Sequence, residues 1–313
     1  MPKIVCVVGP TASGKTKFGV AIAKAIGGEV VSVDSMQIYR GMTVGTAAPT
    51  VEEMEGVPHH MIAVADPWES WSVAKFTEMA DGCIQDILAR GKVPVLVGGT
   101  GLYLDALVRG TDFAAGDSSG ETRKMLQDRV AKEGIEPLFE ELKNIDPEAA
   151  AKLHLKDEKR IIRAMEIYLE TGETITEHDR RTREIPPKYE AVYLGLDFTD
   201  RDDLRARIDK RVDIMVEQGL LQEVENLLAA GLPKDATALQ AIGYKQFLAV
   251  EEGKISTEEA VEEVKLRSRQ YAKRQLTWLR RNKDIHWFYW KKTPDFSAAL
   301  QNATEILTAE GLC

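Results

Sequence analysis

The sequence has few cysteines and no long hydrophobic run. Its three cysteines, Cys6, Cys83 and Cys313, lie far apart and form no C-x-x-C pair, so their spacing suggests neither a disulfide framework nor a zinc site. The apolar run near the N-terminus, residues 4–8, ends at Gly9 and is too short for a signal peptide or a membrane span. We therefore expect a cytoplasmic protein that does not bind a membrane.

The most specific motif follows that apolar run directly. Residues 9–16 form a complete G-x-x-x-x-G-K-T phosphate loop, with Gly9, Pro10, Thr11, Ala12, Ser13, Gly14, Lys15 and Thr16. In such a loop, backbone N–H groups form a cradle for anions and the following helix N-terminus adds partial positive charge. Lys15 is expected to bind the terminal phosphate and the Thr16 hydroxyl to bind Mg²⁺. The motif predicts a bound polyphosphate without distinguishing a nucleotide from another diphosphate.

Strand patterns alternate with helix patterns over the first hundred residues. Apolar runs at 30–33, 61–64 and 93–97 flank a helical pattern at 72–90, for which Ser72 is a plausible N-cap. This order predicts an α/β fold with a P-loop NTPase-like core and a mostly parallel sheet. Ligands of such sheets collect at the carboxyl ends of the strands. We therefore expect Asp34, Asp66 and Thr100, which follow these runs, to lie beside the phosphate loop.

The pattern changes after Gly110. Residues 114–120 read as a flexible linker, and residues 121–184 are almost wholly helical in pattern and heavily charged. We predict a core of residues 1–118 and 188–313 and an inserted helical domain of residues 119–187. The second part of the core is expected to contain a strand at 191–196, helices at 204–230, 238–251 and 257–283, and a buried strand at 285–290.

The charge is unevenly distributed along the chain. The net charge is −9, yet residues 265–292 carry ten Lys or Arg and one acidic residue, Asp284, which makes that stretch +9 and the remainder −18. Aromatic residues such as Tyr271 and Trp278 interleave with it, a combination that binds phosphates and stacks bases. We assign the basic face to RNA, whereas the aromatics of 285–290 fit a buried strand better than a stacking platform.

Seven motifs along the chain carry a resemblance to a known family. They are the phosphate loop, D-S-M-Q-I-Y-R at 34–40, G-V-P-H-H at 56–60, G-G-T-G-L-Y at 98–103, R-I-I-R-A-M-E at 160–166, Q-A-I-G-Y-K at 240–245 and Y-A-K-R-Q-L-T-W at 271–278. Together they resemble the tRNA dimethylallyltransferases, also called tRNA isopentenyltransferases, over nearly the whole length. Two positions depart from that pattern: Ala48 replaces a usual Lys, and Ala63 replaces a frequent Asp.

The resemblance implies transfer of a dimethylallyl group from dimethylallyl diphosphate to N6 of the adenosine immediately 3′ of the anticodon in tRNA. The phosphate loop, Lys15 and Mg²⁺ would then stabilise the leaving diphosphate. The N6 amine must lose a proton, and we assign Asp34 as its acceptor; helix capping or magnesium ligation is the alternative role for this residue. Thr100 is expected to hydrogen-bond the leaving oxygen and to orient the acceptor, the alternative being a simple turn residue.

The same resemblance implies contacts with the tRNA anticodon stem-loop in several parts of the chain. The expected contact residues are Asp34, Ser35, Met36, Gln37, Thr100, Arg123, Glu158, Lys159, Arg160, Ile161, Ile162, Tyr244, Lys245, Lys273 and Arg274. Ser35 and Gln37 could read the adenine edge, and the target base must be extruded from its stack. Closure of the insertion on the anticodon loop would require a mobile linker at 114–120.

Several assignments stay open at this stage. Arg207 and Arg211, four residues apart, could reach the diphosphate or form a surface pattern with Asp203. His59 and His60 lack a third metal ligand at suitable spacing, so we interpret them as structural.

Two other functions compete with prenyl transfer. One is a small-molecule or nucleoside kinase on the same scaffold, with Asp34 as the base, and the other is a non-catalytic RNA-binding or ATPase-like regulator. Kinases of this fold carry an arginine-rich lid, whereas residues 121–184 are long, mixed in charge and net acidic. We therefore favour the transferase, and expect it to act as a monomer.

Overall fold

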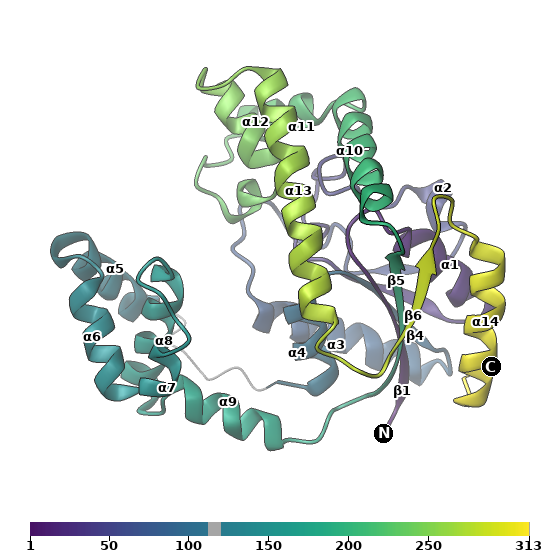
Figure 1. The fold of residues 1–313 in the computed structure, drawn as a ribbon, viewed down its shortest axis with the longest axis horizontal. Helices are drawn as coiled ribbons and strands as arrows, with labels where there is room; N and C mark the ends of the chain where they lie inside the picture. The colour runs from purple at the N-terminus through teal and green to yellow at the C-terminus, as the bar shows by residue number, and fades with distance from the viewer. Residues whose placement is uncertain (112–119, 313) are drawn as a thin grey trace. The chain divides into compact units, whose positions relative to one another are not determined.

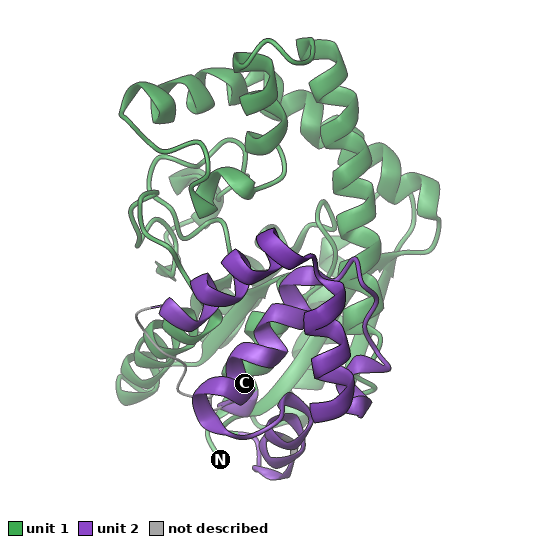
Figure 2. Ribbon diagram, turned by 90° about the vertical axis from the view of Figure 1, so that its left-hand side faces the viewer, with its two compact units in different colours: residues 1–108, 188–313 green, residues 109–187 purple. Residues whose placement is uncertain are grey.

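The computed structural model describes residues 1–111 and 120–312. The predicted mobility of the 114–120 linker and the position of Cys313 fall outside these described residues, apart from Gly120. By their internal contacts the residues form two compact units, coloured separately in Figure 2: unit 1 comprises Met1–Val108 and Lys188–Cys313, and unit 2 comprises Arg109–Pro187.

Unit 1 is built on a parallel sheet of six strands in the order β3-β2-β4-β1-β5-β6 (Figure 1). The strands are β1 (Lys3–Val8), β2 (Glu29–Val33), β3 (His59–His60), β4 (Pro94–Gly98), β5 (Glu190–Phe198) and β6 (Ile285–Trp290). β1 lies between β4 and β5, and its alternate residues are buried in the two hydrophobic clusters that cover opposite faces of the sheet. This explains its continuous apolar sequence, and the predicted parallel sheet is confirmed.

Helices cover both faces of this sheet. One face packs against α1 (Lys15–Ile26) and α14 (Phe296–Ala309), and the other against α3 (Val73–Ala89) and α4 (Gly101–Arg109). The other helices of unit 1 are α2 (Val51–Met54), α10 (Arg201–Glu217), α11 (Leu220–Ala229), the 3₁₀ helix η1 (Thr237–Gln240), α12 (Tyr244–Glu251) and α13 (Thr257–Leu279).

Some predicted boundaries are right and others are wrong. Ser72 caps α3, its hydroxyl accepting a hydrogen bond from Lys75 N at 3.2 Å. The apolar run at 61–64 is not a strand, because Met61 and Ala63 have φ of 62° and 51°, a left-handed conformation that strands exclude. The predicted helix 204–230 is two helices, which Gly219 with φ of 93° separates.

Unit 2 consists of helices in its described part. They are α5 (Glu121–Glu133), α6 (Glu136–Ile145), α7 (Pro147–Ala150), α8 (Glu158–Thr171) and α9 (Ile175–Glu184). Its hydrophobic core includes Leu126, Leu142, Ile161 and Met165. Within residues 1–111 and 120–312, we find no helix with the length and apolar character that crossing a membrane requires.

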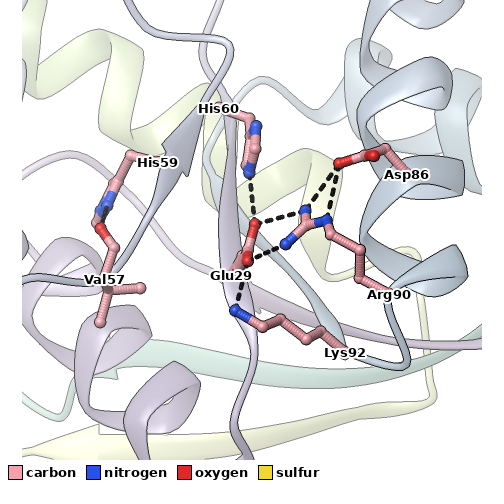
Figure 3. Close-up of polar contacts among 7 residues, drawn as sticks. All are labelled: Glu29, Val57, His59, His60, Asp86, Arg90 and Lys92. Atoms are coloured by element: carbon pink, nitrogen blue, oxygen red, sulfur yellow. Dashed lines mark hydrogen bonds and ion pairs between the residues drawn. The ribbon is translucent and has the colours of Figure 1, made fainter.

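A buried carboxylate at the start of β2 connects three neighbouring segments (Figure 3). The Glu29 side chain is 2% exposed and bonds His60 Nε2 at 2.8 Å, Lys92 Nζ at 2.7 Å and the Arg90 guanidinium. His59 bonds a different group: its Nδ1 lies 2.8 Å from Val57 O. The hydrogen bonds from Arg90, followed by those from Lys92 and His60, hold the pKa of Glu29 well below its usual 4.5 despite the burial that opposes them.

We expect Glu29→Gln to lower the free energy of unfolding by about 2 kcal/mol at pH 7, because the variant loses charge-assisted hydrogen bonds. The pKa of Glu29 is lower in the folded state than in the unfolded state. This stabilisation is therefore fully present above about pH 4.5 and is lost as the pH falls toward the folded-state pKa. Urea unfolding of both proteins from pH 7 to pH 3.5 measures the difference. Glu78→Gln, on an exposed face of α3, serves as the control, and a difference that grows as the pH falls would contradict the expectation.

Candidate active site

The phosphate loop joins β1 to α1 as the sequence predicts. Gly14, with φ of 90°, directly precedes Lys15, the first helical residue. Ala12 has φ of 63°, a conformation that costs a non-glycine residue energy and that clusters at active sites and ligand-binding loops. At Gly9 an added Cβ would lie 2.5 Å from Leu196 O, so the approach of the loop to β5 requires glycine.

A cavity of about 720 Å³ lies over this loop within unit 1. It is lined by loop residues, including Lys15 and Thr16, by Asp34 after β2 and by Gly99 after β4. The lining includes two acidic side chains, Asp34 and Glu53, and five basic ones, Lys15, Lys17, Arg207, Lys210 and Arg211. The apolar lining consists largely of Val30, Val44, Ile62, Val97, Ile214 and Met215. The cavity therefore combines a strongly cationic wall with an apolar one.

The cations of the cavity lack sufficient counter-charge. Burial, reinforced by the nearby charge of Arg211 and opposed by Asp34, lowers the pKa of Lys15 from 10.5 to about 7. Lys15 Nζ donates to Pro10 O at 2.7 Å. Burial also lowers the pKa of Arg211, whose Nε is buried and has no hydrogen-bond partner among the described residues. An anion bound here would supply both a balancing charge and hydrogen-bond acceptors.

Arg207 joins this group from α10. Its Nε donates to Ala12 O at 3.1 Å, and its guanidinium lies 5.5 Å from the ring centre of Phe198. Arg211 follows one helical turn later, and one of its terminal guanidinium nitrogens donates to Ala47 O at 3.5 Å. The structure thus places both arginines at the cavity rather than in a surface pattern with Asp203.

Asp34 and Thr100 come together from the carboxyl ends of β2 and β4. Asp34 Oδ1 accepts hydrogen bonds from the backbone N of Met36 at 2.9 Å and of Gln37 at 3.3 Å. The other oxygen, Oδ2, accepts none within residues 1–111 and 120–312. Thr100 Oγ1 accepts from Ser35 N at 3.3 Å. Asp34 therefore has the turn-capping role that its alternative interpretation assigned, while keeping one carboxylate oxygen for a ligand.

Tyr271 of α13 completes this side of the cavity. It lines the cavity together with Gln275 of the same helix. Burial first, and the nearby charge of Asp34 second, raise its pKa to about 12. Tyr271 is therefore protonated at neutral pH and available as a hydrogen-bond donor.

One residue predicted beside this site, Asp66, lies elsewhere, and another, Gln37, lies at the site with its amide bonded to the chain. Asp66 is exposed, pairs with Arg40 at 2.8 Å and does not line the cavity, so the expectation that it lies beside the phosphate loop is wrong. The prediction assumed that a strand ends just before Asp66, whereas β3 stops at His60. Gln37 lines the cavity, but its amide nitrogen contacts Thr46 O and Ala47 O, both at 3.3 Å, and its amide oxygen lies 2.9 Å from Ser32 Oγ.

Tyr244 lies under the cavity wall rather than on a surface. It is fully buried, and its hydroxyl donates to the carboxylate of Glu223. The same carboxylate accepts from the backbone N of Thr43 at 2.8 Å, Val44 at 2.9 Å and Gly45 at 3.1 Å. Tyr244 and Glu223 therefore fix the 43–46 segment of the wall, next to Ala48, which also lines the cavity. Lys245, the next residue, is exposed.

In unit 2 the predicted tRNA residues divide into exposed and buried groups. Glu158, Lys159 and Arg160 are exposed at the start of α8, whereas Ile161 and Ile162, with 0% and 4% exposure, lie in the core. Lys159 and Arg160 line a separate cavity of about 660 Å³.

Arg123 also lies in unit 2, where it forms an ion pair with Glu166. It donates to Glu166 Oε2 at 2.8 Å, an oxygen that Arg163 also contacts at 2.8 Å. About half of the Arg123 side chain remains exposed.

The basic stretch is only partly available as a surface. Lys273 and Arg274 are exposed on α13. By contrast, Arg269 pairs with Asp209 at 2.6 Å, Lys265 with Asp213 at 2.8 Å and Arg280 with the buried Asp197 at 3.2 Å. The stretch continues into β6, which is a strand as predicted, although Tyr289 within it is 54% exposed.

Three residues that sequence reasoning missed hold the phosphate loop in place. Gln275 Oε1 accepts from Thr11 N at 2.8 Å, and Trp290 Nε1 donates to Ser13 O at 2.8 Å. The Phe296 ring packs so closely on Gly14 that a Cβ there would lie 2.8 Å from it. Gln275 belongs to the Y-A-K-R-Q-L-T-W motif, but nothing in the sequence pairs it with Thr11.

The sequence matches two family models. Residues 37–282 match the IPP transferase family, and residues 2–63 match the isopentenyl transferase family. A tRNA dimethylallyltransferase of Thermoanaerobacter is 43% identical over 98% of this chain and 98% of its own length. Another, from Halalkalibacterium halodurans, is 48% identical over 91% of this chain and 90% of its own length.

Solved structures agree with these matches. The full-length tRNA isopentenylpyrophosphate transferase of Bacillus halodurans is similar with a TM-score of 0.73 and 42% identity, covering 99% of this chain and 96% of that one. A eukaryotic dimethylallyltransferase captured acting on tRNA is similar with a TM-score of 0.81 and 30% identity, covering 99% of this chain and 78% of that one. The cationic phosphate-loop cavity, the sequence matches and the shared fold agree, and the chain belongs to the tRNA dimethylallyltransferase family.

Proposed function

We propose that the protein transfers the dimethylallyl group of dimethylallyl diphosphate to N6 of the adenosine immediately 3′ of the anticodon in tRNA, and releases diphosphate. The observation that carries this proposal is that Lys15 and Asp34 line one cavity. A group that stabilises a leaving anion and a carboxylate that accepts a proton are thereby within reach of one reacting carbon. Membership of the family supports tRNA as the acceptor.

The cationic wall stabilises the leaving group. As the allylic C–O bond breaks, its electron pair moves onto the bridging oxygen of the diphosphate. Lys15, Arg207 and Arg211 meet that charge, together with the backbone N–H groups of the loop and the N-terminus of α1. Because Lys15 and Arg211 are buried and the chain supplies them with little counter-charge, their attraction for the diphosphate is strong.

The residues at the loop fit a magnesium ion that binds mainly through the substrate. Thr16 lines the cavity beside Lys15, and its hydroxyl is a hard oxygen ligand. The described residues contain no group of three or more His, Cys, Asp or Glu that could hold a metal, and Mg²⁺ typically keeps several waters and binds substrate phosphates instead. Bound there, Mg²⁺ would neutralise part of the diphosphate charge.

A second group of residues at the cavity activates the acceptor. The N6 amine forms a bond to the allylic carbon and loses a proton, and we assign that proton to Asp34 Oδ2, because Oδ1 already accepts hydrogen bonds from Met36 N and Gln37 N. Thr100, beside Ser35, and the protonated Tyr271 provide hydrogen-bonding groups that orient the acceptor or the leaving oxygen. The Gln37 amide is engaged with the chain, so it supports the site unless the adenine displaces these bonds.

For tRNA binding we assign direct contacts to the exposed residues and support to the buried ones. The direct contacts are Arg123, Glu158, Lys159, Arg160, Lys245, Lys273 and Arg274. Met36, Ile161, Ile162 and Tyr244 pack inside the units and shape these surfaces. These assignments divide the work between two domains. The helical insertion, residues 119–187, is the tRNA-binding domain, and the core, residues 1–118 and 188–313, performs the prenyl transfer. We also propose that the protein acts as a monomer in the cytoplasm.

The assay that tests this function offers labelled dimethylallyl diphosphate and labelled ATP in parallel. We expect label from the diphosphate donor to appear on tRNA in thin-layer chromatography of its nucleosides. Turnover of ATP without transfer of the prenyl label would instead favour a kinase or a regulatory ATPase.

Lys15→Ala is expected to raise the barrier of the transfer step by about 2–4 kcal/mol, because the charge on the leaving diphosphate loses its nearest cation. The fold should survive, since the cation makes one hydrogen bond to Pro10 O. Single-turnover transfer at saturating donor measures the effect. Lys24→Ala, exposed on the same helix, is the control, and a Lys15→Ala rate equal to that of the wild type would exclude the leaving-group role.

Asp34→Asn is expected to bind both substrates normally and to lose about 10²- to 10⁴-fold in the chemical step, because an amide cannot accept the amine proton. The Asn oxygen can still accept from Met36 N and Gln37 N, so the turn should persist. The single-turnover rate is measured across pH. Near-normal rates with an unchanged pH dependence would remove Asp34 from the base role.

Replacing Lys273 and Arg274 by Gln is expected to weaken tRNA binding and to flatten its salt dependence, by about one unit of log–log slope for each ion pair with a phosphate that the substitutions remove. Donor affinity should not change. Filter binding between low and physiological salt measures the slope. The matched control is Arg269→Gln, whose side chain pairs with Asp209 and should affect stability more than the slope. An unaltered slope in the double variant would move the RNA surface to Arg123, Lys159 and Arg160.

A further inference from the structure

The amide of Gln275 bridges two loops of the active site. Its oxygen accepts from Thr11 N at 2.8 Å in the phosphate loop, and its nitrogen donates to Gly99 O at 3.0 Å in the loop after β4. Gln275 is buried, with 6% of the residue exposed. A Cβ at Gly99 would lie 2.2 Å from this nitrogen, so glycine at that position leaves the space that the bridge occupies.

The bridge continues on one side to the acceptor residues. Gly99 precedes Thr100, whose hydroxyl accepts from Ser35 N at 3.3 Å, and Ser35 follows Asp34. On its other side, the bridge holds the N–H of Thr11 in the loop that ends at Lys15. The groups proposed to hold the diphosphate and those proposed to receive the N6 proton are therefore connected through one side chain.

We propose that Gln275 is a positioning residue that fixes the spacing between the donor's diphosphate and the acceptor adenine; this inference rests on the proposed transferase function. Displacement at carbon requires the attacking N6 and the leaving oxygen to lie in line across the allylic carbon. Each reactant is held by a different loop, and a displacement of about 1 Å can cost 10²-fold in rate. Gln275 does not touch the reacting atoms; it sets the distance between the loops that do.

The anchoring of α13 does not depend on this bridge. The helix is also held by the buried Leu276 and Leu279 and by Trp278 Nε1, which donates to Asp105 Oδ2 at 2.8 Å. A variant at Gln275 should therefore fold, and its effect should fall on alignment rather than on the amount of native protein.

The test compares Gln275→Met, which fills similar space without hydrogen bonds, with wild type and with Gln270→Met, an exposed glutamine of the same helix. Single-turnover transfer is measured at saturating donor and tRNA, with binding constants for both. We expect the Gln275→Met rate constant to fall by about 10- to 100-fold while the reactive fraction and both binding constants stay within about twofold. The proposal would be overturned if the rate constant did not change, or if the only change were a smaller fraction of enzyme able to react.

A second variant reports on the donor half of the bridge. Gln275→Glu keeps an acceptor for Thr11 N, and only its protonated form can donate to Gly99 O. We expect the ratio of its rate constant to that of the wild type to rise as the pH falls, because protonation restores the group that donates to Gly99 O. A ratio independent of pH would overturn the bridge. If wild-type protein transfers no label to tRNA, the proposed function fails instead, before either variant is compared.

Discussion

The active site depends on holding a strained phosphate loop open toward its ligand. Ala12 and Gly14 have left-handed backbone conformations, and contacts from residues that follow β5 hold the loop in that shape. Arg207 and Trp290 bond the carbonyls of Ala12 and Ser13, and Gln275 accepts from Thr11 N. Backbone strain of this kind persists only where surrounding contacts over-determine it, so the helices and β6 that follow β5 are part of the phosphate site.

The two charged clusters of unit 1, around Glu29 and around Lys15 and Arg211, differ in how well their charges are balanced. Around Glu29, three basic groups share one buried carboxylate, and the cluster is satisfied within the chain. Around Lys15 and Arg211 the cations outnumber the acids, and burial lowers the pKa of both. The first arrangement stabilises the fold, whereas the second keeps electrostatic energy that only an added anion can recover.

Residues within one motif serve different physical purposes. Tyr244 lies in a motif expected to contact tRNA, yet it is buried and bonded to Glu223, which holds the 43–46 segment. In α8, Arg160 faces solvent while the adjacent Ile161 is in the core, as the helical period requires. Many motif residues therefore preserve the shape of a surface that their exposed neighbours present to the substrate.

The sequence by itself determined the phosphate loop, the parallel α/β core, the helical character of residues 121–184 and the family, because these follow from local patterns and motif spacing. It placed β6 and the Ser72 cap correctly for the same reason. Only the tertiary structure decided that Asp66 lies outside the site, that Arg269 and Arg280 are paired within the chain, and that Gln275 reaches Thr11. These contacts join residues up to 264 positions apart, and no local periodicity records which distant backbone group a side chain will meet.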